Sequence, residues 1–143
     1  MKIRPATAAD AAAIAEVFVA GQELWAEEGE TPAAMAPPAI AGDEMVAEDD
    51  DGIVGFAIIK GCEVDLLFTH PRAWGQGAGR ALIVAAEDTL RAAPCSEVSL
   101  WTEERNSRAR RVLQASGWRK TKELREREWN DAPLRELRYR KRL

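Results

Sequence analysis

Histidine and cysteine are scarce in this chain: of 143 residues, only His70 is a histidine, and only Cys62 and Cys95 are cysteines. The two cysteines lie far apart and form no Cys-x-x-Cys pair, so we expect neither a disulfide scaffold nor a structural zinc site. The lone histidine precedes Pro71 at the end of an expected strand, which argues against most nucleophile arrangements that need a Cys/His pair. We therefore expect no metal ligands.

Long hydrophobic runs are also missing. The longest apolar run, residues 53–59, contains Gly55 and is too short to cross a bilayer as a helix. A secretory signal would need an unbroken apolar stretch near the start, but Pro5, Asp10 and Glu16 interrupt that segment. The expectation is a cytoplasmic protein with no membrane partner.

The composition is that of a globular protein, with 46% hydrophobic residues, 31% charged residues and a formal net charge of −4. A chain of this size fits one domain over residues 1–143. The charge is uneven, because residues 1–65 hold 14 carboxylates against three basic side chains, whereas residues 118–143 hold 10 basic side chains against five acids. An acidic surface near a site would attract a cationic ligand.

The order of elements expected from hydrophobic spacing and turn residues is β-α-β-β-β-α-β-α-β-β, a mixed α/β domain. A helix capped by Thr7 or Asp10 should follow the first strand and run to about Glu27, before a loop over 28–42. Asn106 and Gly117 should bound a later helix. The strands are expected over 2–6, 44–48, 53–60, 62–69, 97–101, 118–129 and 134–140, and the remaining helix over about 77–92.

The most informative segment is a glycine-rich turn between the strand over 62–69 and the following helix, with Gly75, Gly77 and Gly79 in alternate positions. Glycines remove the Cβ atoms that would keep a ligand away, and successive amide N–H groups at a helix start can bind phosphate. A P-loop beginning at Gly75 would need Gly and Lys where Arg80 and Ala81 stand. The dinucleotide fingerprint would need its third glycine at Arg80.

What remains resembles the GNAT superfamily of acetyltransferases, whose signature is a strand, a proline and Arg/Gln-x-x-Gly-x-Gly/Ala leading into a helix. Pro71, Gly77 and Gly79 match, whereas Trp74 stands where Arg or Gln is usual. Asn106 to Ala109, followed by Gly117 and Trp118, resembles the second conserved helix of the family and its turn. The resemblance covers essentially the whole chain and implies a mostly antiparallel sheet flanked by helices.

The resemblance implies that acetyl-CoA is the co-substrate, with its pyrophosphate held by the turn and its pantetheine arm bound along the strand. Asn106 is expected either to contact that arm or only to cap its helix. Arg72, Arg108, Arg110 and Arg111 are further candidates for the adenosine phosphates, although Arg80 is preferred. The residues assigned to cofactor binding are Leu67, Phe68, Thr69, Gly75, Gln76, Gly77, Ala78, Gly79, Arg80 and Asn106.

The resemblance also implies direct acetyl transfer to an amine, without a covalent enzyme intermediate. An alkyl ammonium with a pKa of about 10 must lose a proton before it attacks, and either Glu63 or Asp65 can accept that proton. Period-two alternation predicts that these two carboxylates share a strand face with Leu67 and Thr69. The backbone N–H near Phe68 is the expected oxyanion donor.

Two positions depart from the family pattern. Leu113 stands where many members carry a tyrosine general acid, so the group that protonates the leaving thiolate is unassigned; Tyr139 is a candidate, with core packing as its alternative role. Trp74 brings no positive charge to the phosphates, and it either weakens CoA binding or packs on the turn.

The resemblance implies an acceptor site between the first-helix region and the closing hairpin, for a small-molecule or protein amine. Glu23, Glu27, Glu28 and Glu30 could attract a cationic amine there, and Trp25, Trp101, Trp118 and Trp129 either line the pocket or pack in the core. The edge of the closing hairpin could pair with a second copy in a homodimer.

One alternative function is a non-catalytic CoA-binding module that regulates a partner protein. The other is a nucleic-acid arm over 119–142, but its alternation with Leu, Trp and Glu favours a hairpin, so no nucleic-acid partner is expected.

Overall fold

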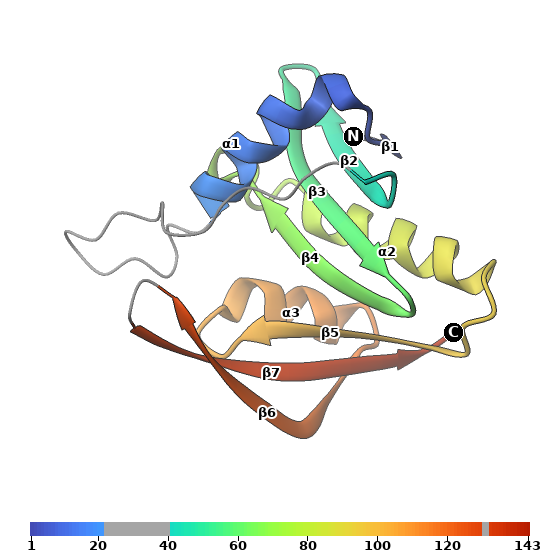
Figure 1. Ribbon diagram of the computed structural model, residues 1–143, viewed down its shortest axis with the longest axis vertical. Coiled ribbons are helices and arrows are strands. Elements are labelled where there is room, and N and C mark those ends of the chain that lie inside the picture. Colours follow the sequence, from blue (N-terminus) through green and yellow to red (C-terminus); the bar gives the residue numbers. More distant parts are fainter. Residues whose placement is uncertain (22–40, 130–131) are drawn as a thin grey trace.

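The computed structural model describes residues 1–21, 41–129 and 132–143. It has the expected element order within those residues and confirms a mixed, mostly antiparallel α/β fold (Figure 1). The strands are β1 (Lys2–Pro5), β2 (Glu44–Asp49), β3 (Gly52–Lys60), β4 (Glu63–Thr69), β5 (Glu97–Glu103), β6 (Arg119–Trp129) and β7 (Ala132–Arg142). The helices are α1 (Ala11–Gly21), α2 (Ala78–Arg91) and α3 (Ser107–Ala115), with short 3₁₀ helices at Ala8–Asp10 and Pro71–Ala73.

The seven strands form one sheet in the order β1-β2-β3-β4-β5-β7-β6. All neighbours are antiparallel except β4 and β5, which run parallel and are connected through α2. This parallel pair also has the fewest paired residues, because only Glu63–Ser99 and Val64–Leu100 are partners. The two strands separate beyond Leu100, and Figure 1 shows them diverging toward their carboxyl ends.

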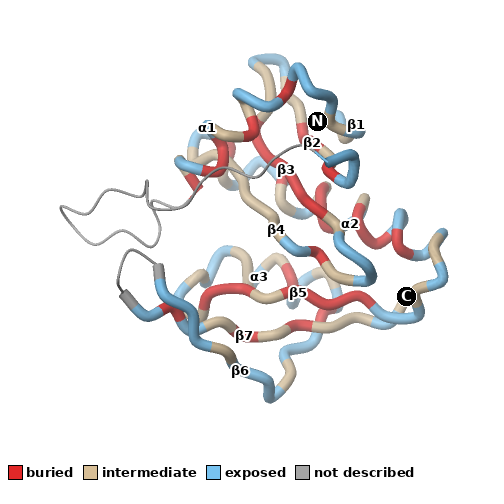
Figure 2. Tube along the Cα trace, viewed as in Figure 1, coloured by how far each residue is buried: buried red, intermediate tan, exposed pale blue. Residues whose placement is uncertain are grey.

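The helices cover opposite faces of the sheet. Ile14, Val17 and Phe18 of α1 pack on Val46 and Phe56 of the central strands. On the other face, Leu82 of α2 packs on alternate residues of the same strands, and further along α2 the core continues into β5, β7 and α3. Figure 2 shows the resulting buried residues along β3 and β5. Each large side chain fully buried in this way contributes about 1.5–3 kcal/mol.

The first helix is described only to Gly21. The rest of the predicted helix, to about Glu27, and most of the predicted loop over 28–42 lie outside the described residues. The capping expectation is met by a local pair: the N–H of Thr7 donates to the carboxylate of Asp10 at 2.7 Å at the start of the first 3₁₀ helix.

The helix α3 has the predicted boundaries. The Asn106 side chain accepts a hydrogen bond from the Ala109 N–H at 3.1 Å, which satisfies one of the free amides of the first turn. Gly117 follows the helix with a φ of +87°, a conformation that glycine adopts without strain. The chain then turns into β6 through Trp118, whose buried indole donates to Glu87 of α2.

The predicted face alternation of β4 is wrong, because the strand contains a bulge at Asp65. Leu66 is the partner of Ile58, but Val64 is the partner of Ile59, so β4 has one extra residue. The extra residue reverses the alternation on its amino-terminal side. Val64 and Leu67 therefore pack on the α2 side, and Glu63 does not share a face with Leu67 and Thr69.

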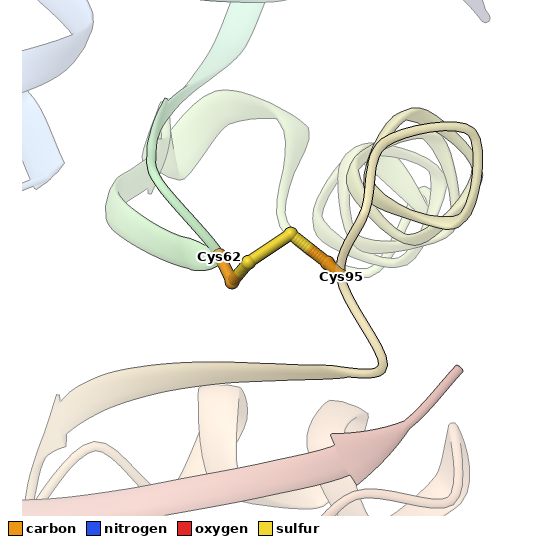
Figure 3. Close-up of a disulfide and its surroundings, with 2 residues drawn as sticks. All are labelled: Cys62 and Cys95. Atoms are coloured by element: carbon orange, nitrogen blue, oxygen red, sulfur yellow. A yellow bond between two sulfur atoms is a disulfide. The ribbon is translucent and has the colours of Figure 1, made fainter.

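The structure also corrects the expectation for the cysteines. Cys62 and Cys95 form a disulfide, with their Cα atoms 5.8 Å apart (Figure 3). Each cysteine lies just before one of the parallel strands, and the starts of neighbouring parallel strands meet at the same edge of a sheet. Separation in sequence was therefore a poor guide, because the crossover through α2 brings the two residues together.

Candidate active site

The separation of β4 from β5 creates a cavity of about 430 Å³ in the middle of the sheet. Residues from Val64 to Thr69 line one side and residues from Leu100 to Glu103 line the other. Because β4 is paired with β5 only as far as Val64, its remaining edge faces this cavity. An extended ligand could therefore bind there as an added strand would.

The glycine-rich turn forms the rim of the cavity at the start of α2. Gly75 and Gly77 have φ values of +80° and +88°, which other residues rarely adopt, and no atom lies within 4 Å of a Cβ built on either. Gly79 lies in the first turn of α2 with ordinary helical geometry. This combination leaves bare backbone at the positive end of a 14-residue helix, which favours an anion.

Most of the residues predicted to bind the cofactor line this one cavity. They are Leu67, Phe68, Thr69, Gly75, Gly77, Ala78, Gly79, Arg80 and Asn106. Gln76 is absent from the lining, although it belongs to the same turn. Asn106 caps α3 and also lines the cavity, so its two predicted roles are compatible.

The helical side of the cavity is positively charged. Arg80 of α2 and Arg108 and Arg111 of α3 line it, and no carboxylate does so among the described lining residues of these two helices. The other predicted phosphate ligands are engaged elsewhere: Arg72 pairs with Asp49, and Arg110 donates to the Tyr139 hydroxyl.

Trp74 packs on the turn, which is one of its two predicted outcomes. Its indole Nε1 donates to the carbonyl of Thr69 at 3.3 Å. The guanidinium carbon of Arg108 lies 3.9 Å from the centre of the Trp74 ring, a cation–π contact. The positive charge that is missing from Trp74 itself is therefore supplied at the same place by α3.

The two candidate bases are placed differently. Asp65, at the bulge, lines the cavity, and its carboxylate lies 3.4 Å from the Lys60 ammonium. Glu63 is absent from the cavity lining, and its buried Oε1 has no hydrogen-bond partner among the described residues. The geometry thus favours Asp65 over Glu63 as the carboxylate that can meet an acceptor.

Of the two positions considered for the general acid, one lines the cavity and the other does not. Leu113 lines the cavity but has no proton to donate. Tyr139 is fully buried in the core, with its hydroxyl hydrogen-bonded by Arg110, and it does not line the cavity. Core packing, the alternative role for Tyr139, agrees with this position.

The wall opposite the helices contains charged residues that the sequence analysis did not single out. Leu100 packs toward α2 and α3, so the adjacent Trp101 faces the other way, as does Glu136 next to the buried Leu137. Arg125 and Arg127 of β6 line the cavity with them. The alternation within the closing hairpin could have placed these residues on one face, but it gave no reason to connect that face with the glycine turn. Glu23, Trp25, Glu27, Glu28 and Glu30 lie outside the described residues, as does the side chain of Trp129.

Comparison with known proteins gives results consistent with this geometry. Residues 12–118 match the model of the acetyltransferase (GNAT) family. A mycothiol acetyltransferase from Beutenbergia cavernae is 43% identical over 56 residues, which are 39% of this chain and only 19% of that protein, so the match spans about one fifth of the relative.

Two solved structures have a similar fold. A GCN5-related N-acetyltransferase from Rhodopseudomonas palustris has a TM-score of 0.84 and 25% identity, covering 99% of this chain and 95% of that chain. A phosphinothricin acetyltransferase from Sinorhizobium meliloti, in complex with acetyl-CoA, has a TM-score of 0.76 and 19% identity, covering 99% and 88%. The fold of the whole described chain is therefore shared with acetyltransferases.

Proposed function

Because the chain belongs to the GNAT acetyltransferase family, we propose that it transfers an acetyl group from acetyl-CoA to an amine within the cavity between β4 and β5. Acetyl-CoA is the co-substrate of this family. The observation that carries the proposal for this chain is the joining of the glycine turn, the open edge of β4 and the bulge at Asp65 in one cavity. The residues present fit the cofactor, since bare backbone and three arginines line the cavity where its phosphates would bind.

In the proposed complex, the amides from Gly75 to Arg80 hold the pyrophosphate at the start of α2. Arg80, Arg108 and Arg111 add positive charge from the helical side. The pantetheine arm lies along Leu67 to Thr69 as an added strand, within reach of the Asn106 side chain. These contacts position the thioester near the bulge, where β4 and β5 meet.

The acceptor approaches from the wall that contains Trp101 and Glu136. Its ammonium group must lose a proton, and Asp65 accepts that proton directly or through a water molecule. The amine nitrogen then attacks the thioester carbonyl, with the backbone N–H near Phe68 stabilising the oxyanion. The carbon–sulfur bond then breaks and the thiolate leaves. The second proton of the attacking nitrogen passes through water to this thiolate, whose conjugate thiol has a pKa of about 8.5, so the products are the amide and CoA thiol.

The acceptor group is an amine, either of a small molecule or of a protein. The non-catalytic CoA-binding module differs from it in predicting no turnover. The family assignment and the presence of a carboxylate in the cavity favour the enzyme. Release of CoA thiol in the presence of an amine panel distinguishes the two functions.

Location and assembly remain proposals. None of the described helices is long and apolar enough to cross a membrane. A cytoplasmic location is retained as a prediction; in that reducing compartment Cys62 and Cys95 would be thiols rather than a disulfide. A homodimer through β6 is proposed because β6 is an edge strand with Leu124 51% exposed, and light scattering of the purified protein tests it.

The sharpest test of the cofactor site is Gly79→Glu. The backbone at Gly79 has no positive φ, and the nearest atom to an added Cβ is the Thr69 methyl at 3.8 Å, so the chain can accept a side chain there. The new carboxylate would occupy the space of the phosphates and repel them. We expect acetyl-CoA binding, measured by calorimetry, to be lost while thermal unfolding is preserved.

The matched control is Val84→Glu, which places the same charge on α2 at a residue that is 43% exposed and does not line the cavity. It should bind acetyl-CoA as the native chain does. The cofactor assignment is wrong if both variants bind equally well, or if the folded native chain gives no heat with acetyl-CoA. Gly77→Glu is a poorer test, because its φ of +88° would add backbone strain.

A further inference from the structure

Two arginines on the acceptor wall share one carboxylate. Arg125 Nε donates to Glu136 Oε1 at 2.9 Å, and Arg127 Nη1 lies 3.6 Å from the same oxygen. All three residues line the cavity. Within this cluster two guanidinium groups face one carboxylate, so one positive charge is uncompensated there, although Glu128 of the same strand also lines the cavity.

The arginines are held in place with their donors available. The Arg125 guanidinium stacks on Trp101, 4.5 Å from the ring centre, and binds Glu136 through Nε alone. Within the described part of the chain, its two Nη groups have no hydrogen-bond partner, and the Arg127 side chain makes no hydrogen bond. The Glu136 side chain is only 14% exposed, so this half-buried carboxylate anchors both arginines.

Two other charged side chains beside this cluster, Arg138 and Glu103, are already paired. Arg138, on the same Trp101 ring, donates to Glu123 and to the Ser99 hydroxyl. Glu103, the cross-strand partner of Glu136, has both carboxylate oxygens bound by Arg105. Among the described residues that line the cavity, the free guanidinium donors of this wall are therefore those of Arg125 and Arg127, and they suit an anion. A planar guanidinium matches a carboxylate particularly well.

From this arrangement, and resting on the proposed acetyl transfer, we propose that the acceptor is a small amine that also bears a carboxylate, such as a free amino acid. Its carboxylate binds Arg125 and Arg127, and its amine points across the cavity toward Asp65 on β4. This substrate class differs from a simple cationic amine, which the acidic residues before position 65 would favour and which these two arginines would repel.

The experiment compares matched acceptors that differ only in the carboxylate. Alanine, leucine and phenylalanine are tested against alaninamide, leucinamide and phenylalaninamide, with spermidine as a cationic amine without a carboxylate. The kcat/KM ratio of each acid to its amide is measured in the native chain, Arg125→Gln and Arg127→Gln. Comparing this ratio between proteins cancels the different basicity of the two amines.

We expect the native chain to acetylate at least one amino acid. Each Gln variant should lower the acid-to-amide ratio by about tenfold or more, through KM for the acid, because a charge-assisted hydrogen bond is lost. Arg125→Lys should recover only part of the ratio, since lysine lacks the forked geometry. Arg119→Gln, on the same strand but outside this cavity, is the control that should not change it.

Calorimetric binding of acetyl-CoA and the thermal midpoint of each variant show whether the cofactor site and the fold are intact. The inference is overturned if amides or spermidine are acetylated as well as the acids, if the Gln variants leave the ratio unchanged, or if no amino acid is acetylated. A failure of this inference alone leaves acetyl-CoA binding and acetylation of other amines in place. Loss of acetyl-CoA binding in the native chain would instead contradict the proposed function.

Discussion

A single inserted residue in β4 determines which of the two candidate carboxylates lines the cavity. The bulge places Asp65 in the cavity and leaves Glu63 out of its lining. Asp65→Asn should lower kcat at neutral pH by about 10²- to 10⁴-fold, the usual contribution of a general base, while KM for acetyl-CoA stays close to the native value. Initial rates with a reactive amine measure both.

The pH profile and a second variant separate this role from a structural one. The deficit of Asp65→Asn should shrink as the pH rises toward the pKa of the acceptor, because more of the amine is then already neutral. Glu63→Gln is the competing variant, since the sequence alone allowed either carboxylate. A larger loss in Glu63→Gln than in Asp65→Asn would transfer the role to Glu63.

Residues that act through local backbone geometry were predictable, and those that depend on register were not. The spacing of Gly75, Gly77 and Gly79 identified the turn, because positive φ and bare backbone are properties of neighbouring residues. The face of Glu63 was predicted wrongly, because alternation assumes an uninterrupted strand and β3 imposes a bulge. Arg125 and Arg127 were missed as a pair because Glu136, which orders them, is on another strand.

At the scale of elements, one buried carboxylate joins the first strand to the first helical segment. Asp10 accepts hydrogen bonds from both Nη groups of Arg4, at 2.8 and 2.9 Å, and one from the Thr7 N–H. The hydrogen bonds from Arg4, followed by the one from Thr7, hold the pKa of Asp10 well below its ordinary value. Asp10 therefore stabilises the folded state in its charged form.

Asp10→Asn should lower the free energy of unfolding by about 2 kcal/mol at pH 7, the scale of a hydrogen bond to a charged group. Because the folded pKa is depressed, the contribution is complete above the unfolded pKa of about 4 and is lost as the pH falls toward the folded value. The gap between native and variant should be constant from neutral pH down to that point and then close. Urea unfolding at several pH values measures it, with exposed Asp50→Asn as the control; a gap that persists in acid would contradict it.

The boundaries of most elements were predicted from capping and turn residues. Asn106 and Gly117 bounded α3 correctly, because a cap acts within one turn of its helix. The pairing of the parallel neighbours β4 and β5 was harder to predict, since it depends on how α2 packs across the sheet rather than on the sequence of either strand. The two strands pair over only two residues each and then separate to form the cavity, and no pattern in the sequence indicates this.

At the scale of the whole molecule, the sheet consists of two halves joined at a narrow point. Strands β1 to β4 and strands β5 to β7 meet through two residue pairs, and the disulfide lies at the same end. The two cysteines are 33 residues apart, so the chain-entropy model gives a stabilisation of about 4 kcal/mol from the cross-link. Its presence was not predicted, because pairing depends on tertiary contact rather than on spacing.

The double variant Cys62→Ser, Cys95→Ser should unfold about 4 kcal/mol more easily than the oxidised native chain. The difference should nearly disappear when both proteins are unfolded in the presence of a reductant. Thiol titration of the denatured chain, before and after reduction, establishes the oxidation state of each sample. Equal stability of the oxidised native chain and the double variant would show that the bridge adds nothing to the fold.

Among the described residues, two indoles line the cavity, one on each of its two walls. Trp74 packs on the glycine-rich turn against Arg108, and Trp101 lies on the opposite wall against Arg125. The molecule thus contains its own fluorescent reporters. Replacing one indole at a time by phenylalanine would assign emission changes to coenzyme or to acceptor, so that the order in which the two substrates arrive can be followed without a label.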